Sequence, residues 1–125
     1  MPEARRPLVW IGRSERDFLR FPELVQDDFA RALELARKGA REIPGAKALS
    51  HGLLKGLGVV ELVEDFDGDT YRAVYTAKVG VVLAVLHAFK KKSKSGIATP
   101  RHDIALIRRR YRTAVQRFSN QRDRR

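Results

Sequence analysis

Hydrophobic positions follow a helical spacing in the first third of the chain. Apolar residues recur at three- and four-residue intervals between Pro22 and Gly39: Val25, Phe29, Ala32, Leu33 and Ala36. This spacing predicts one buried face of a helix. A shorter helix is expected from Glu15 to about Arg20, with Ser14 as N-cap and Asp17 as its capping-box partner. The apolar run 7–11 before it predicts a first strand.

The middle of the chain alternates with a period of two. Residues 59–66, 71–78 and 81–89 are rich in β-branched and aromatic residues, which predicts three strands. Asp67, Gly68 and Asp69 favour a tight hairpin turn between the first two strands. The loop region 43–58, which contains several glycines, precedes them, and short helical turns are expected at 46–49 and 53–57.

The register of the last two strands decides which side chains meet. If Val79 and Gly80 form a two-residue turn, Lys78 pairs with Val81, Val74 with Val85, and Arg72 with His87. Because side chains alternate between the faces of a strand, one face then carries several polar groups. Its residues are Glu61, Val63, Arg72, Val74, Thr76, Leu83, Val85, His87 and Phe89. The opposite face carries Val60, Leu62, Phe66, Tyr71, Ala73, Tyr75, Val82, Ala84, Leu86 and Ala88.

A last helix is expected after Ser95 and Gly96, with Thr99 as its cap and Pro100 in its first turn. Its apolar stripe is Ile104, Ile107, Tyr111, Ala114 and Phe118. The order strand, helix, helix, three strands, helix predicts an α+β fold. In it, a small, mainly antiparallel sheet carries a helical hairpin on one face and leaves a basic face open. One domain is expected over residues 1–118, followed by a flexible basic tail at 119–125.

Charge is concentrated at one end of the chain. Residues 1–89 carry 13 Lys and Arg against 13 Asp and Glu, whereas residues 90–125 carry 13 against 2, which accounts for the net charge of +11. A neutral body with a basic C-terminal third is typical of proteins that bind polyanions. The chain has no cysteine and no apolar run long enough for a membrane span, so a reducing cytoplasm is the expected location.

The polar face suggests a phosphate site. Arg72 is suited to neutralise a phosphorane, because a guanidinium binds two phosphate oxygens and stays charged; its structural alternative is an ion pair with Glu61 or Asp65. His87 is a candidate proton carrier and Glu61 a candidate base. The lysines at 90, 91, 92 and 94 would contact RNA. His51, His87 and His102 are scattered along the chain, so neither a metal site nor a cofactor is expected.

Two segments resemble the RelE/ParE toxin superfamily, and most closely its phage-derived, HigB-like branch. They are LLKGLGVVELVEDFDGDTYRAVYTAKVG at 53–80 and VLHAFKKKSKSGIATPRHDIALIRRR at 85–110. The resemblance implies a ribosome-dependent endoribonuclease that cleaves mRNA and is neutralised by a cognate helix-turn-helix antitoxin. It places the family's arginine at Arg72 and its basic residue after the final strand at Lys91, with Lys90 and Lys92 as near alternatives.

The same resemblance implies an RNA-backbone contact for Lys55, and His51 is a further candidate for lining the site. At positions where the best-studied branch carries catalytic lysines, this chain has Glu61 and Val63. Two alternatives therefore stay open. One is a ParE-like inhibitor of a DNA topoisomerase, which needs no acid and base, and the other is a non-catalytic basic module that binds nucleic acid.

Overall fold

The fold is a mixed sheet with a helix on each face. A computed structural model of the chain describes residues 5–92 and 98–120. The strands are β1 Leu8–Trp10, β2 Ala46–Ala48, β3 Val59–Phe66, β4 Asp69–Thr76 and β5 Leu83–Lys92. The helices are α1 Ser14–Phe18, α2 Glu23–Arg37 and α3 Arg101–Phe118, with a short 3₁₀ helix, η1, at Gly52–Leu54. This arrangement confirms the predicted α+β class.

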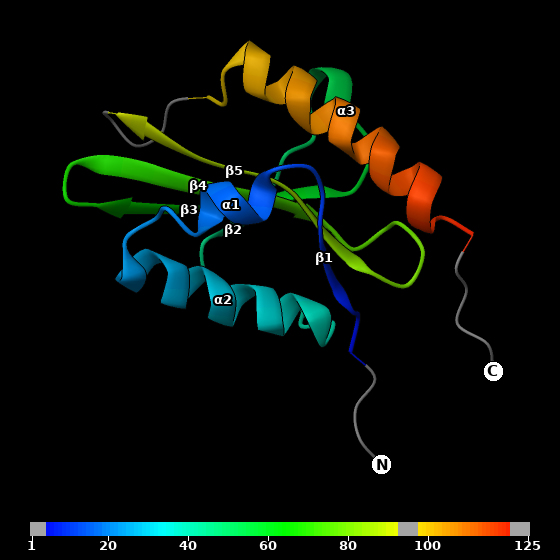
Figure 1. Cartoon of the computed structure of the whole chain (residues 1–125), viewed down its shortest axis with the longest axis horizontal. Helices are drawn as coiled ribbons and strands as arrows, with labels where there is room; N and C mark the ends of the chain where they lie inside the picture. Colours follow the sequence, from blue (N-terminus) through cyan, green and yellow to red (C-terminus); the bar gives the residue numbers. More distant parts are fainter. Residues whose placement is uncertain (1–4, 93–97, 121–125) are drawn as a thin grey trace.

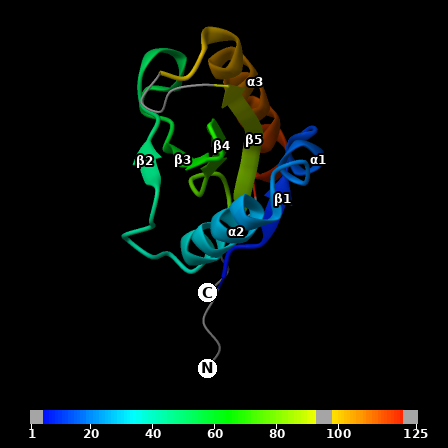
Figure 2. The same cartoon turned by 90° about the vertical axis from the view of Figure 1, so that its left-hand side faces the viewer.

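The strands lie in the order β1-β5-β4-β3-β2. All neighbours are antiparallel except β1, which runs parallel to β5 at one edge of the sheet. Helix α2 lies along one face and α3 crosses the other, as Figures 1 and 2 show from two sides. The predicted open basic face is therefore wrong, because α3 and η1 cover it.

Each face of the sheet has its own apolar core. On the α2 side, Val25, Phe29 and Leu33 of the helix pack with Leu62 and Tyr75 of the strands. On the α3 side, the buried residues are Ile11, Leu49, Leu54, Val59, Val74, Val79, Val82, Ala84, Leu86, Ile104, Ile107 and Ala114. The stripes predicted for the two long helices are confirmed at Val25, Phe29, Ala32, Leu33, Ala36, Ile104, Ile107 and Ala114, all of which are buried.

The hairpin between β3 and β4 forms as predicted. Phe66 pairs with Asp69, so Asp67 and Gly68 alone make the turn. Both have positive φ angles, 52° and 84°, which is the backbone of a type I′ turn. The register that follows pairs Glu61 with Val74 and Val63 with Arg72, which places Glu61 on the same face as Arg72.

The predicted pairing of β4 with β5 is wrong. The strands end at Thr76 and begin again at Leu83, so residues 77–82 connect them in place of a two-residue turn at Val79-Gly80. Arg72 pairs with Phe89, and Val74 pairs with His87. A β-bulge follows, since Tyr75 pairs with Val85 and leaves Leu86 as the extra residue.

The bulge reverses the faces of the first half of β5. Leu83 and Val85 belong to the core on the α2 side, whereas Ala84 and Leu86 belong to the core on the α3 side, the opposite of the prediction. After the bulge the alternation is restored, so His87 and Arg72 do share a face. They are diagonal neighbours on it and do not face each other directly.

Three local predictions are also corrected. Residues 46–48 form the edge strand β2 and not a helical turn. The Ser14 hydroxyl donates to the carbonyl oxygen of Val85 at 3.0 Å and does not cap α1. The Thr99 hydroxyl likewise donates to a carboxylate oxygen of Glu61 in β3 and does not cap α3, whose N-cap is Pro100. Within the described ranges, no helix is long and apolar enough to span a membrane.

Candidate functional site

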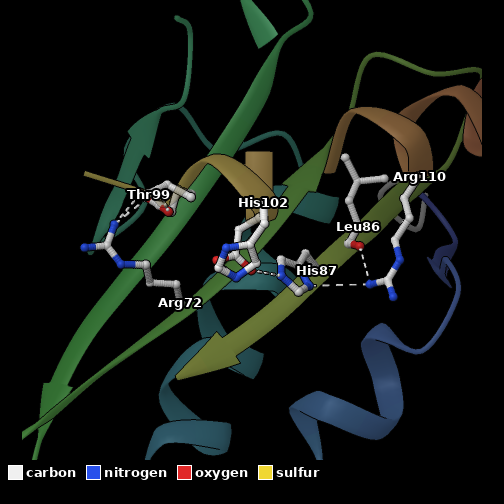
Figure 3. A network of polar contacts seen from close by, with 8 residues as sticks. Arg72, Leu86, His87, Thr99, His102 and Arg110 are labelled. Atoms are coloured by element: carbon white, nitrogen blue, oxygen red, sulfur yellow. Dashed lines mark hydrogen bonds and ion pairs between the residues drawn. The ribbon is translucent and has the colours of Figure 1, made fainter. Parts of the chain in front are cut away.

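A buried ion pair lies at the centre of the face covered by α3. Arg72 of β4 and Glu61 of β3 are each 1% exposed, and Arg72 Nη1 donates to Glu61 Oε1 at 3.0 Å. Thr99, just before α3, donates its hydroxyl to Glu61 Oε2 at 2.7 Å and lies 3.5 Å from Arg72 Nη1. Figure 3 shows Thr99 and Arg72 side by side. Because charges are costly to bury alone, each partner of this pair depends on the other.

A second pair links β5 to the start of α3. His87 Nε2 lies 2.7 Å from Asp103 Oδ1, and the two residues are 6% and 7% exposed. The other oxygen of Asp103 lies 3.2 Å from Nε2 of His102, whose side chain is largely in solvent. The imidazole of His87 also stacks on Phe89, with ring centroids 4.7 Å apart. Asp103 therefore connects a buried imidazole to an exposed one.

Arg110 approaches His87 from the other side. Its Nη1 donates to the carbonyl oxygen of Leu86 at 3.0 Å and lies 3.5 Å from His87 Nδ1 (Figure 3). A guanidinium can only donate, so Nδ1 is the acceptor and the hydrogen of a neutral His87 sits on Nε2, facing Asp103. Burial lowers the pKa of Arg110. Gly12 leaves room for this side chain, since a Cβ there would come within 2.8 Å of Arg110 Nε.

The other predicted site residues lie outside this network where the structure describes them, and Lys90 pairs with Tyr71, on the opposite face of the sheet. Lys55 and His51 are exposed on either side of η1. The ammonium nitrogen of Lys90 lies 3.7 Å from Oδ2 of Asp69, and Lys91 is half-buried. The side chain of Lys92 and the whole of Lys94 fall outside the described residues. The structure thus brings Glu61, Arg72 and His87 onto one face, while Lys55, Lys90, Lys91 and His51 lie outside its buried centre.

Three residues of this network were not predicted as site residues. Thr99 and Asp103 were interpreted as features of the start of α3, and Arg110 as part of a solvated arginine run. All three belong to the last helix or the turn before it, so their contacts depend on how α3 crosses the sheet. The one available signal was the isolated acidic charge of Asp103 in a strongly basic segment. Among the described residues, no cluster of three or more His, Cys, Asp or Glu side chains is arranged to hold a metal ion.

A family model described as phage derived protein Gp49-like (DUF891) matches residues 16–112. The chain belongs to this family. The match spans most of the chain and includes every residue of the buried network, from Glu61 to Arg110. The Gp49-like family is a family of RelE/HigB-type toxins, which act in pairs with antitoxins. No curated protein matches the chain.

Proposed function

We propose that this Gp49-like protein is the toxin of a toxin–antitoxin pair and that it cleaves mRNA on the ribosome without a metal ion. The observation that carries the proposal is the placement of Arg72, Glu61 and His87 on one sheet face inside the family-matched segment. The basic C-terminal third supports it, because the phosphate backbone supplies most of the affinity of nucleic-acid binding.

RNA cleavage without a metal needs a base for the 2′-OH, an acid for the leaving oxygen and a positive group at the phosphorane. Arg72 supplies the positive group, and its preferred partner is an oxyanion. In the described conformation that oxyanion is the carboxylate of Glu61. A scissile phosphate would take the place of this carboxylate, and Thr99 would withdraw from above the pair. Glu61, once released, is available as a base.

His87 serves as the proton carrier in this proposal: Glu61 takes the proton of the 2′-OH, and the imidazolium form of His87 gives a proton to the leaving oxygen. Asp103 fixes the ring orientation and would stabilise that imidazolium. Arg110 Nη1 lies 3.5 Å from His87 Nδ1, and it thereby favours the tautomer whose hydrogen is on Nε2. Lys55, Lys90 and Lys91, with Lys92 and Lys94, bind the RNA backbone around the site. His51 is the further polar side chain beside Lys55.

The test is induced expression followed by mapping of mRNA 5′ ends. Arg72→Ala alone is ambiguous, since it leaves Glu61 buried without its partner and destabilises the fold. The sharper variant is the double substitution Arg72→Met with Glu61→Leu, because apolar residues of similar volume often replace a buried ion pair without loss of stability. We expect this variant to fold and to leave mRNA intact. Cleavage at the level of the unmodified protein would reduce the pair to a structural role.

One observation favours a second function. The Arg72–Glu61 pair is fully buried, and its two charged groups bond to each other, as in a structural ion pair. A ParE-like toxin that inhibits a DNA topoisomerase would need no acid and base on this face. It would keep growth inhibition in the double variant, with no new mRNA ends in either protein. Supercoiling of plasmid DNA by purified gyrase then measures the alternative directly.

A further inference from the structure

A groove of about 640 Å³ opens on the α2 side of the sheet, on the face opposite the Arg72 site. It lies between the end of α2, the loop that follows, the edge strand β2 and the ends of β3 and β4. Its volume falls in the range of sites that bind small ligands or single peptide side chains. The toxin activity proposed above makes no use of it.

The floor of the groove is apolar with one polar atom. Ala36, Ile43 and Val60 line it together with Tyr75, which is 3% exposed. Burial raises the pKa of the Tyr75 phenol, so the hydroxyl stays protonated. Within residues 5–92 and 98–120, no hydrogen bond involves this hydroxyl. The floor therefore suits an apolar side chain and leaves one donor for a polar group beside it.

The rim of the groove is cationic. Arg41 and Lys78 are exposed, and neither forms an ion pair within the part of the chain that the structure describes. Lys47 pairs with Glu61 of β3, so its side chain lies on the opposite face of the sheet. Glu42 is the single acidic residue among the described lining residues. The stem of Lys78 lies against Gly58, where a Cβ would come within 2.5 Å of Lys78 Cγ. Its ammonium is thus held near the groove, and the rim carries uncompensated positive charge.

The shape of the groove favours a peptide over a nucleic acid. Bases bind to proteins by stacking on exposed aromatic faces, whereas Tyr75, the aromatic residue among the described lining residues, is buried. Strand β2 is the last strand of the sheet, and all three of its residues line the groove. An edge strand next to an apolar groove is the arrangement that binds extended peptides.

We propose that this groove docks a peptide segment of a partner protein, in which a branched apolar side chain enters the groove and acidic residues on either side pair with Arg41 and Lys78. The occupant is recognised by chemistry that is complementary to the site: an apolar anchor for the floor and carboxylates for the rim. Its position on the α2 side means that it binds without covering Arg72 or His87.

The probe is a short fluorescein-labelled peptide in which Leu alternates with Asp and Glu, measured by fluorescence anisotropy against the full chain. The double variant Arg41→Glu, Lys78→Glu should weaken binding about fivefold, the combined effect of two exposed charge pairs. The matched control, Arg16→Glu, Arg109→Glu, changes the net charge equally at exposed positions away from the groove. It should change binding by less than about twofold.

Two further measurements locate the peptide. Amide shifts in a ¹⁵N spectrum should change at residues 41–48 and 75–78, and Ala77→Leu, which fills the groove without altering charge, should reduce binding. Equal losses in the double variant and its control would mean that net charge alone attracts the peptide. Unchanged binding of a peptide with Ser in place of Leu would exclude an apolar anchor. Displacement by oligouridylate with the same amide shifts would assign the groove to nucleic acid. Each of these three results would overturn the proposal.

Discussion

At the scale of single residues, the Arg72–Glu61 pair links stability to the proposed chemistry. Arg72→Ala should lower the free energy of unfolding by about 3–5 kcal/mol, because it leaves a buried carboxylate without its partner. Arg72→Met with Glu61→Leu should recover most of this loss. Urea denaturation of the three proteins checks the prediction. A single variant as stable as the unmodified chain would show that water already reaches Glu61.

The His87–Asp103 contact gives a prediction at the same scale. Asp103→Asn should reduce mRNA cleavage about ten- to a hundredfold and change the pH dependence of the rate, because the imidazolium loses its carboxylate. The matched control is His102→Gln, which removes the exposed imidazole on the other oxygen of Asp103. This control should leave both the cleavage rate and its pH dependence unchanged. A purely structural Asp103 would lower stability without moving the pH profile.

At the scale of elements, a carboxyl pair lies between β3 and α2. Glu64 and Asp28 line one groove, in which Arg31 pairs with Asp28. Burial, followed by hydrogen bonding to Asp28 and its negative charge, raises the pKa of Glu64 from 4.5 to about 7. The folded protein thus binds this proton more tightly than the unfolded chain. The resulting stabilisation is fully present below pH 4.5 and is lost as the pH rises through 7.

Glu64→Gln should therefore be nearly neutral at pH 5 and should stabilise the protein by about 1 kcal/mol at pH 8, a figure reduced for solvent screening. Denaturation at the two pH values checks it. Glu42→Gln, at an exposed carboxyl, is the control and should show no such difference. Equal effects of Glu64→Gln at both pH values would place the pKa of Glu64 near its ordinary value.

The elements themselves were largely predictable, and their contacts were not. Helix α2 and the β3–β4 hairpin follow from spacing and from the Asp67-Gly68 turn, which are local signals. The position of Arg72 relative to His87 depended on the bulge at Leu86, for which an unbroken run of apolar residues from Val81 gives no sign. The face of Glu61 was predicted correctly, because the two-residue Asp67-Gly68 turn sets the register of β3 against β4. Asp103 and Arg110 required the crossing of α3 over the sheet, which no pattern within a single segment specifies.

At the scale of the whole molecule, the uneven charge predicts strongly salt-dependent binding. Replacing Lys90, Lys91, Lys92 and Lys94 by Gln should weaken binding to ribosomes and lower the slope of log K against log salt by up to about three. A control that replaces four exposed cations in the neutral part of the chain, Arg16, Arg20, Lys38 and Lys47, should leave the slope nearly unchanged. An unaltered slope in the lysine variant would direct attention to the exposed arginines of α3.

The parallel pairing of β1 with β5 has a consequence for synthesis of the chain. Leu8 pairs with Leu83 and Trp10 with Val85, so the first strand has no partner until the last strand exists. Contacts between segments so distant in the chain form late and slow folding. A ribosome making this protein must therefore translate through β5, and extrude it, before the sheet can close. The newly made protein therefore becomes a folded toxin only after β5 has left the ribosome.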